Sequence, residues 1–354
     1  MEVSSAVFRK LHQKTMIEID GSFLEGGGQI IRTAVGLSAV TGKPVKIFNI
    51  RKGRQNTGLQ AQHLAGIKAV AEICSGELKG AELKSTEVEF IPGKIKSGSY
   101  KFDVGTAGAV TLVLQSLIIP AIHAEKEIVF EIRGGSHVSW SPTTGYFRHI
   151  FSEYLKKMGV EIESETLIYG FYPRGGGTIL VKIHSGKLTP LNILERGKLI
   201  ETEAWSNASQ NLASTKVGER QIEGAEKIMP LKSKVKYVDT FSVGSSITIA
   251  SKFENCFLGA SALGERNKKA EDVGKEAALL LQKQLDSSAT LDEWMSDQIL
   301  PFLALVNGKS EFIAPELTKH AETNMWVIKK FLNVDFKIEC LEKGVMISCS
   351  GSKI

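Results

Sequence analysis

Apolar and polar residues follow two different periods along the chain, and these periods predict which segments form strands and which form helices. Short apolar runs bounded by Gly or Pro, such as residues 87–91, are typical of strands. Other segments repeat their apolar residues every three or four positions, as expected for one face of a helix: Leu64, Ile67, Ala71 and Cys74. Strands and helices follow one another along most of the chain, which is typical of an α/β or α+β protein.

One arrangement recurs: a short strand, then a turn of glycines or small polar residues, then a helix. This recurrence indicates a duplicated strand–helix unit, although identity between the copies is weak. The predicted pairs of strand and helix are 17–20 with 30–40, 100–104 with 110–119, 128–132 with 146–157, and 311–313 with 325–331.

The character of the sequence changes near residues 187–196, where the glycine-rich turns stop and Lys and Glu become frequent. We therefore predict a small inserted α/β domain at 196–289, within a large domain formed by 16–195 and 290–354, and an N-terminal extension at 1–15. Within the insert, we expect strands at 197–204, 234–240, 246–252 and 256–263, and helices at 207–228 and 268–285.

Composition places the chain among soluble globular proteins. It has 354 residues, of which 42% are hydrophobic and 23% charged, so it can bury a full core. The net charge of +5 permits an anionic partner without demonstrating one. The first fifteen residues lack the apolar core of a secretory signal, and no apolar run reaches the roughly 18 residues of a membrane span. The four cysteines are scattered and form no Cys-x-x-Cys pair, which disfavours structural zinc. We expect a cytoplasmic protein without a membrane partner.

His320 is the first candidate for chemistry, because it lies in a polar turn between a predicted strand and a predicted helix. The N-terminal end of a helix favours anions. A neutral imidazole at that position could attack a phosphorus atom and carry a phosphoryl or nucleotidyl group covalently. A single exposed histidine is more often inert, so this hypothesis depends on the rest of the chain.

A triple glycine at 26–28 could bring backbone amides close to a phosphate. It matches neither a Walker A loop nor a dinucleotide-binding fingerprint, and tight packing of a turn is an equal alternative. Gln29 and Arg32 share the first turn of the following helix. Glu25 could hold a divalent cation through oxygen.

Two further groups of residues suit a nucleotide. Arg51 and Arg54 precede Gln62 and His63, and arginine forks match phosphate oxygens, although a solvated basic loop is the alternative. In the segment 291–298, Trp294 could stack on a purine, while Asp297 and Gln298 are spaced to meet one base, ribose or cation. Gln115 interrupts an apolar helix and needs a hydrogen-bond partner, which is either backbone or a ligand. We interpret the glycines at 175–177 as mainly structural.

Taken together, these segments resemble the RNA 3′-terminal phosphate cyclase family, in particular its catalytic members from archaea and bacteria. The similar motifs occur in family order over about 300 residues. They are Asp20-Gly21, Glu25-Gly-Gly-Gly-Gln29-Ile-Ile-Arg32, Ile50-Arg51-x-Gly-Arg54, Gln62-His63-Leu64, Thr111-Leu-Val-Leu-Gln115, Gly170-Phe171-Tyr172-Pro173-x-Gly-Gly-Gly177, Asp297-Gln298 and His320-x-x-Thr323-Asn324.

The resemblance implies a fold, a reaction and a set of roles. The fold would be three repeated β-α-β-α-β-β units plus a small inserted α/β domain. The reaction would use ATP and Mg²⁺ or Mn²⁺ to convert an RNA 3′-terminal phosphate into a 2′,3′-cyclic phosphate, through AMP held on His320 and an RNA-3′-pp-5′-adenosine intermediate. Adenosine would be bound by Gln115, Pro142, Trp294, Met295, Ser296, Asp297 and Gln298. Phosphates and RNA would be bound by Gln29, Arg32, Arg51, Arg54, Gln62 and His63, and the metal by Glu25.

Some positions depart from the family pattern, which affects substrate preference more than the reaction. Tyr169 stands where His or Arg is frequent, Trp294 where Tyr is common, and residues 134–142 differ from bacterial members. Two other readings are a non-catalytic cyclase-like protein that binds RNA during ribosome maturation, and an enolpyruvyl-transferase-like enzyme. The first lacks the nucleophilic histidine, and the second is supported by analogy of fold alone.

Overall fold

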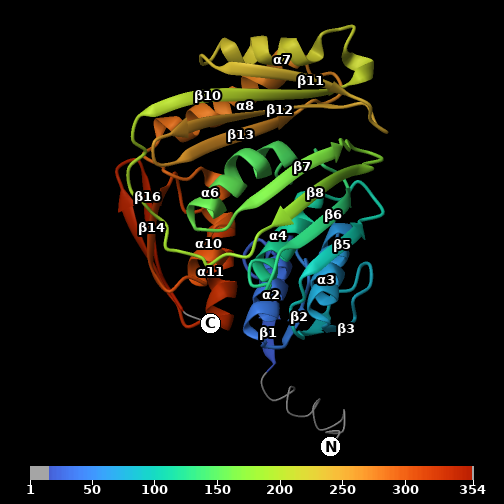
Figure 1. Cartoon of the computed structure of the whole chain (residues 1–354), viewed down its shortest axis with the longest axis vertical. Coiled ribbons are helices and arrows are strands. Elements are labelled where there is room, and N and C mark those ends of the chain that lie inside the picture. Colours follow the sequence, from blue (N-terminus) through green and yellow to red (C-terminus); the bar gives the residue numbers. More distant parts are fainter. Residues whose placement is uncertain (1–15, 353–354) are drawn as a thin grey trace, which may run out of the picture.

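The computed structural model describes residues 16–352, and these form four four-stranded sheets with helices packed against them (Figure 1). The mixed α/β class predicted from the sequence is confirmed. The N-terminal extension predicted at 1–15 lies outside the described residues. Within the described part of the chain, no helix combines the length and the hydropathy needed to cross a membrane.

Three of the four sheets share one pattern of strand pairing. Their strand orders are β1-β2-β4-β3, β5-β6-β8-β7 and β9-β14-β16-β15. In each sheet the first pair is parallel and the other two pairs are antiparallel. Because helices connect the parallel strands in the same places, we infer three copies of one β-α-β-α-β-β unit.

The elements of the three units follow in chain order. The first unit contains β1 (Ile17–Asp20), α2 (Gly28–Thr41), β2 (Val45–Phe48), α3 (Ala61–Cys74), β3 (Glu77–Lys79) and β4 (Val88–Ile91). The second contains β5 (Gly98–Asp103), α4 (Val110–Ala121), β6 (Ile128–Gly134), α5 (Thr144–Tyr146), a π-helical turn (Phe147–Phe151), α6 (Ser152–Lys157), β7 (Ile162–Ile168) and β8 (Gly177–Ile183). The third contains β9 (Asn192–Ile193), α9 (Glu293–Gln298), α10 (Leu300–Ala304), β14 (Gly308–Ala314), α11 (Lys319–Phe331), β15 (Asp335–Leu341) and β16 (Gly344–Gly351).

The fourth sheet lies between β9 and α9 in the sequence and forms the upper layer of Figure 1. Strand β10 pairs in parallel with β11 and antiparallel with β12, while α7 and α8 pack against each other. We propose that this layer is the inserted domain. Its elements are β10 (Leu199–Ser209), a 3-10 turn (Gln210–Leu212), α7 (Val217–Glu226), β11 (Lys232–Val238), β12 (Ser245–Phe253), β13 (Phe257–Leu263) and α8 (Ala270–Asp286).

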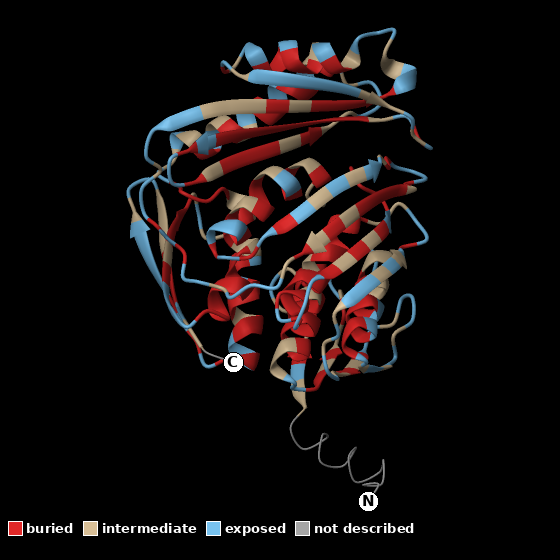
Figure 2. Cartoon of the chain, in the orientation of Figure 1, coloured by how far each residue is buried: buried red, intermediate tan, exposed pale blue. Residues whose placement is uncertain are grey.

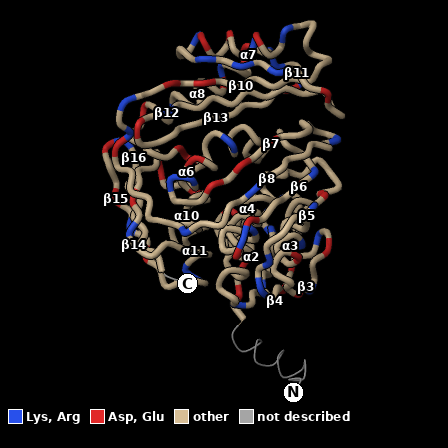
Figure 3. Tube along the Cα trace, in the orientation of Figure 1, with Lys and Arg blue, Asp and Glu red and all other residues tan. Residues whose placement is uncertain are grey.

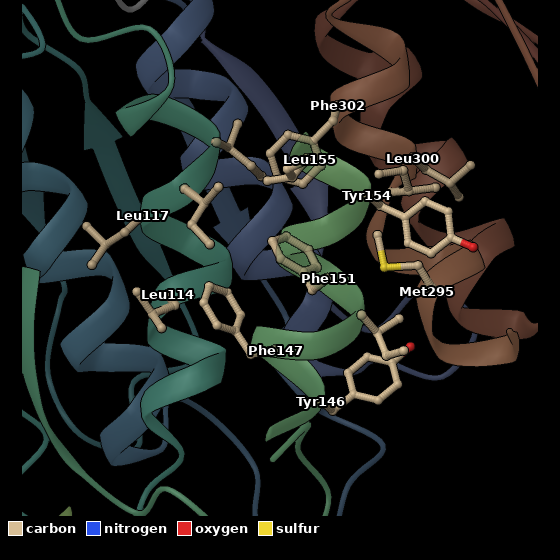
Figure 4. Packing of buried hydrophobic residues seen from close by; sticks show 14 of the residues in the cluster. Leu114, Leu117, Tyr146, Phe147, Phe151, Tyr154, Leu155, Met295, Leu300 and Phe302 are labelled. Atoms are coloured by element: carbon tan, nitrogen blue, oxygen red, sulfur yellow. The ribbon is translucent and has the colours of Figure 1, made fainter. Parts of the chain in front are cut away.

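The core of the large domain is built around helices from all three units. Helix α2 packs against α3, α4 and α11, and buried residues run through this region (Figure 2). Helix α4 is apolar on every side, as expected for a helix enclosed by protein, and only Gln115 keeps partial exposure. Leu114 and Leu117 of α4 lie close to Phe147, Phe151 and their neighbours in Figure 4.

Two predicted helix boundaries are wrong. The helix predicted at 207–228 starts only at Val217. Residues 207–209 instead extend β10 and pair with β11, and residues 207–208 also pair with β12. The helix predicted from 325 begins six residues earlier, at Lys319, where the hydroxyl of Thr318 accepts the N–H of Ala321 at 3.0 Å and caps the helix. His320 is therefore part of the first turn of α11.

Candidate functional site

A cavity of about 1160 Å³ opens where the ends of α2, α3, α4, α9 and α11 meet, so all three units contribute to it. A cleft of this size holds a nucleotide-sized ligand. It brings together nearly every residue predicted from the sequence: Glu25, Gln29, Arg32, Arg51, Arg54, Gln62, His63, Gln115, Pro142, Trp294, Asp297, Gln298 and His320.

Two predicted residues, Met295 and Ser296, do not line the cavity. Both are fully buried, and Met295 packs in the core shown in Figure 4. In the short helix α9, Asp297 and Gln298 lie three and four positions after Trp294, so all three residues share the face toward the cavity. The residues between them point to the opposite side, so their side chains are not placed to touch a ligand.

His320 lies at the start of α11 with its side chain half exposed. Its Nδ1 is 2.8 Å from Oε2 of Glu25. The two atoms lie within ion-pair distance, but their geometry is not that of a hydrogen bond, and Oε2 of Glu25 has no hydrogen-bond partner among the described residues. The carboxylate lies on the Nδ1 side of the ring, so this contact leaves Nε2 unoccupied. A neutral imidazole carries a lone pair on one ring nitrogen, which is the form that a nucleophile requires.

The protonation of His320 is set by its surroundings. Burial lowers the pKa of the imidazole below its usual value, and the positive charges of Arg32 and Arg54 lower it further, while the carboxylate of Glu25 raises it. Because the lowering effects prevail, the ring is neutral at physiological pH.

Steric crowding explains why a glycine is needed at position 28. A Cβ atom at this position would collide with Nε2 of His63 and would approach Nη1 of Arg32 to 3.1 Å. Only a glycine lets α2 begin this close to the histidine. The packing role proposed for the glycines and a role in the site are therefore compatible.

His63 is a neutral donor at the floor of the cavity. Its Nδ1 accepts the backbone N–H of Gln60 at 3.2 Å, so the proton lies on Nε2. Burial, with Arg32 and Arg51 nearby, lowers its pKa to about 3. The ring therefore stays uncharged and offers Nε2–H to an anion.

Three arginines supply the positive charge of the site. Burial lowers the pKa of Arg32 to about 10, so it stays protonated at neutral pH. The Nε of Arg54 donates to the carbonyl oxygen of Glu25 at 2.8 Å, and that of Arg51 donates to the carbonyl of Asn56 at 3.1 Å. Each bond holds a guanidinium by one N–H and leaves the others for a phosphate. Lys, Arg, Asp and Glu are otherwise interspersed along the trace (Figure 3).

The opposite part of the cavity suits a base. Trp294 contacts Tyr146 edge to face, with ring centroids 6.2 Å apart. Nε2 of Gln115 donates to Oε1 of Gln298 at 2.7 Å, and Gln298 donates to the carbonyl of Trp294 at 2.8 Å. These bonds hold two amide groups beside a flat aromatic surface, which is an arrangement that can read a purine.

Asp297 and Gln62 also have defined surroundings. Burial raises the pKa of Asp297 to about 8, although the charge of Arg32 opposes this. Oε1 of Gln62 accepts the backbone N–H of Ala109 at 2.9 Å, at the N-terminus of α4. Gln62 thus caps a helix with one end of its amide and keeps its NH₂ group for other partners.

The motif that contains Asn324 was recognised in the sequence, but the role of Asn324 in joining three helices was not predicted. Its Oδ1 accepts from the hydroxyl of Thr33 at 2.9 Å and its Nδ2 donates to the carbonyl of Asp297 at 3.0 Å. Asn324 therefore joins α11 to α2 and α9. A polar residue on the inner face of an amphipathic helix was the available signal.

The aromatic residues Trp140 and Tyr172 also line the cavity, and nothing in a loop sequence indicated this.

The described residues 16–352 contain no group of three His, Cys, Asp or Glu side chains able to hold a metal ion. Glu25, predicted as a metal ligand, contacts His320, and Nη2 of Arg54 lies 3.9 Å from the same oxygen. Metal binding by Glu25 stays a prediction, because a single carboxylate oxygen can also bind a divalent cation whose other ligands are water and phosphate oxygens.

Comparison with known proteins agrees with these observations. The model of the family described as RNA 3′-terminal phosphate cyclase matches residues 23–338. The protein named RNA 3′-terminal phosphate cyclase from Methanopyrus kandleri is 44% identical over 337 residues, covering 92% of this chain and 95% of the relative. Proteins with the same name from Archaeoglobus fulgidus and Saccharolobus solfataricus are 40% and 44% identical and cover 92% and 91% of this chain, or 98% and 96% of their own lengths. The chain belongs to the RNA 3′-terminal phosphate cyclase family.

Proposed function

We propose that this protein uses ATP to convert an RNA 3′-terminal phosphate into a 2′,3′-cyclic phosphate, with His320 as the covalent carrier of AMP. One observation carries the proposal. An imidazole with its Nδ1 held against Glu25 lines the same cavity as Arg32, Arg51 and Arg54. A neutral imidazole in a cavity lined by three arginines suits attack on a phosphorus atom.

In the first step, the lone pair on Nε2 of His320 attacks the α-phosphorus of ATP. A P–N bond forms, the bond to the bridging oxygen breaks, and pyrophosphate leaves. The carboxylate of Glu25 stabilises the positive charge that develops on the ring. The arginines stabilise the added negative charge on the phosphoryl oxygens.

In the second step, an oxygen of the RNA 3′-phosphate attacks the same phosphorus. The P–N bond breaks, and the imidazole returns to its neutral form as RNA-3′-pp-5′-adenosine forms. In the third step, the 2′-hydroxyl gives its proton to solvent water as its oxygen attacks the RNA phosphorus. A new P–O bond closes the ring, the bond to the bridging oxygen breaks, and AMP leaves. Adenylation is necessary because it turns an oxygen of the terminal phosphate into part of a good leaving group.

The base of ATP is proposed to lie against Trp294, near Gln115, Gln298 and Pro142. The hydroxyl of Thr111 donates to the carbonyl of Pro142 at 2.7 Å, which holds this loop against α4. Arg51, Arg54 and His63 are then proposed to hold the terminal phosphate of RNA. Both ligands reach His320 from within one cavity.

The test is incubation with ATP labelled at the α-phosphate, with Mg²⁺ or Mn²⁺ present. We expect an acid-labile, base-stable adduct on the unmodified protein and none on His320→Ala. His184→Ala is the matched control, because His184 also contacts a glutamate, Glu163 at 2.6 Å, but does not line the cavity. Label that persists on His320→Ala would exclude this residue as the nucleophile. No label on the unmodified protein would favour the alternative, a cyclase-like protein that binds RNA without catalysis.

A further inference from the structure

Three large aromatic side chains are exposed at one edge of the cavity. Trp140 is 98% exposed, Tyr172 is 76% exposed and Phe241 is 55% exposed. We refer to these three residues as the aromatic rim. Trp140 and Tyr172 also line the cavity that contains His320, whereas Phe241 does not. The rim is thus continuous with the proposed active site.

The rim is assembled by three loops that contact one another. The N–H groups of Ser136 and His137 donate to the carbonyl of Gly170 at 2.9 and 3.2 Å, which ties the loop of Trp140 to the loop of Tyr172. The N–H of Arg174 donates to the hydroxyl of Ser242 at 3.0 Å, which ties the second loop to the loop of Phe241. The inserted layer therefore contributes to this edge of the cavity.

Packing inside the chain does not account for Trp140. Its backbone has φ of 64°, a left-handed conformation that costs a residue other than glycine free energy. Its side chain is almost wholly in solvent, so it gains little from burial. Large exposed aromatics next to a cavity are typical of a surface that binds a ligand.

We propose that the aromatic rim stacks on the unpaired bases immediately upstream of the RNA 3′-phosphate while that phosphate lies in the cavity. This inference rests on the proposed function and adds the part of RNA that the site recognises. RNA bound to single-strand-binding proteins commonly stacks its bases on aromatic side chains. A strand whose terminal phosphate reaches the arginines and leaves over Trp140 and Tyr172 would place its preceding bases on the rim.

Charge favours RNA over an apolar protein partner. Arg174 is exposed two residues after Tyr172. The exposed Lys236 has its Nζ 5.3 Å from the ring centre of Tyr169, three residues before Tyr172. These cations suit the phosphates that connect stacked bases. Because every base has a flat face, stacking here would tolerate any sequence at the 3′ end.

The test is a fluorescence anisotropy titration of a labelled single-stranded oligoribonucleotide with a 3′-phosphate, without ATP. We expect Trp140→Ala and Tyr172→Ala each to raise the Kd about five-fold or more, because loss of one stacked base costs this much. Trp140→Phe should restore most of the affinity. Leu279→Ala is the matched control, because Leu279 is also exposed (47%) but lies on α8 and does not line the cavity.

An RNA that lacks the bases next to its 3′ end tests whether the rim contacts those bases. It should bind the unmodified protein about as weakly as intact RNA binds a double variant that combines Trp140→Ala with Tyr172→Ala. This double variant should bind both RNAs equally. Thermal unfolding of each variant would show that the fold is retained. A Kd within two-fold of the unmodified protein for Trp140→Ala and Tyr172→Ala overturns the proposal. So does equal binding of intact RNA and RNA lacking those bases.

The same variants would also reveal a different binding partner of the rim. If the variants alter sedimentation but leave RNA affinity unchanged, the rim contacts a second copy of the chain and the proposal is wrong. Labelling by ATP needs no RNA, so failure of the proposed function appears as an unlabelled protein. Failure of the rim proposal appears in the anisotropy titration instead.

Discussion

At the scale of single residues, the cavity combines two histidines of lowered pKa with the positive charge of three arginines. Burial and two arginines lower the pKa of His320, while the carboxylate of Glu25, 2.8 Å from Nδ1, raises it. His63 is kept neutral by the same causes, with a pKa near 3. Burial is thus the main cause of both lowered pKa values, and the arginines add to it.

The protonation of His320 gives a pH prediction for adenylation. The lone pair on Nε2 is present above the pKa of the folded protein and is lost as pH falls through it. Since that pKa is lowered from 6.5, the midpoint of the fall in the single-turnover labelling rate should lie below pH 6.5. A midpoint above pH 6.5 in this profile would contradict the assignment.

Glu25→Gln tests the partner of His320 in the same assay. The change removes a negative charge that raises the pKa of the imidazole, so the midpoint should move to lower pH. Labelling should slow by about ten-fold, since a charge-assisted contact to the reacting ring is lost. Unchanged rate and midpoint would show that Glu25 does not act through His320.

Gly28→Ala tests the close approach of α2 to His63. The added Cβ would displace the histidine ring. Overpacking of this kind costs about 1–3 kcal/mol of unfolding free energy, and labelling should fall with it. Urea unfolding and labelling measure the two effects. Gly53→Ala is the stability control, because a Cβ there meets no atom within 4 Å.

At the scale of elements, α11 shows what sequence periodicity can and cannot predict. Its apolar positions indicated a helix, but the first turn, with His320, was assigned to a loop because it is polar. The cap formed by Thr318 decides where the helix begins. In the same way, residues 207–209 were predicted as helix, and their pairing with two distant strands overrides that local preference.

The residue types of the site were recognisable because phosphate and base binding require particular side chains. Their orientation was harder to predict. Met295 and Ser296 are neighbours of Trp294, yet they face the core because α9 turns them away. Trp140 and Tyr172 lie in loops, where no period indicates a side chain's direction.

Thr318→Ala tests the capped start of α11. Loss of the hydroxyl that accepts the N–H of Ala321 should lower the unfolding free energy by about 1 kcal/mol and slow labelling several-fold, because His320 lies in the same turn. Thr318→Ser should restore both properties. Thr215→Ala, at an exposed threonine of the inserted layer, should leave stability within about 0.5 kcal/mol. Equal losses in Thr318→Ala and Thr215→Ala would contradict a specific capping role.

At the scale of the whole molecule, the inserted layer is joined to the large domain by buried polar contacts. The carboxylate of Asp292 accepts the N–H of Gly259 in β13 at 3.0 Å and the hydroxyl of Tyr146 at 2.5 Å. The hydroxyl of Tyr154 accepts the N–H of Phe257 at 3.1 Å and lies 2.6 Å from the carbonyl oxygen of Thr290. These contacts cross from β13 to the helices beneath it, so the two parts should unfold together.

Arg196 offers the sharpest test of whether the two parts unfold together, because it contacts residues near the point where the chain returns from the inserted layer to the large domain. Its guanidinium donates to the carbonyl oxygens of Gln284, Leu285, Ser287 and Ala289 at 2.5–3.0 Å. Arg196→Met removes all four bonds. Because water can reach some of these carbonyls, the loss of unfolding free energy should be about 2–4 kcal/mol.

The transition of Arg196→Met in urea should remain single, with tryptophan fluorescence and circular dichroism coinciding, because Trp205 reports on the inserted layer and Trp326 on the large domain. Arg266→Ala, at an exposed arginine of the inserted layer, should leave stability within about 0.5 kcal/mol. Two separate transitions in the unmodified protein would show that the layer folds as an independent body. The loop of Phe241 would then be free to move relative to the loops of Trp140 and Tyr172. Contacts between the inserted layer and the large domain, such as the bond from Arg174 to Ser242, hold these loops together.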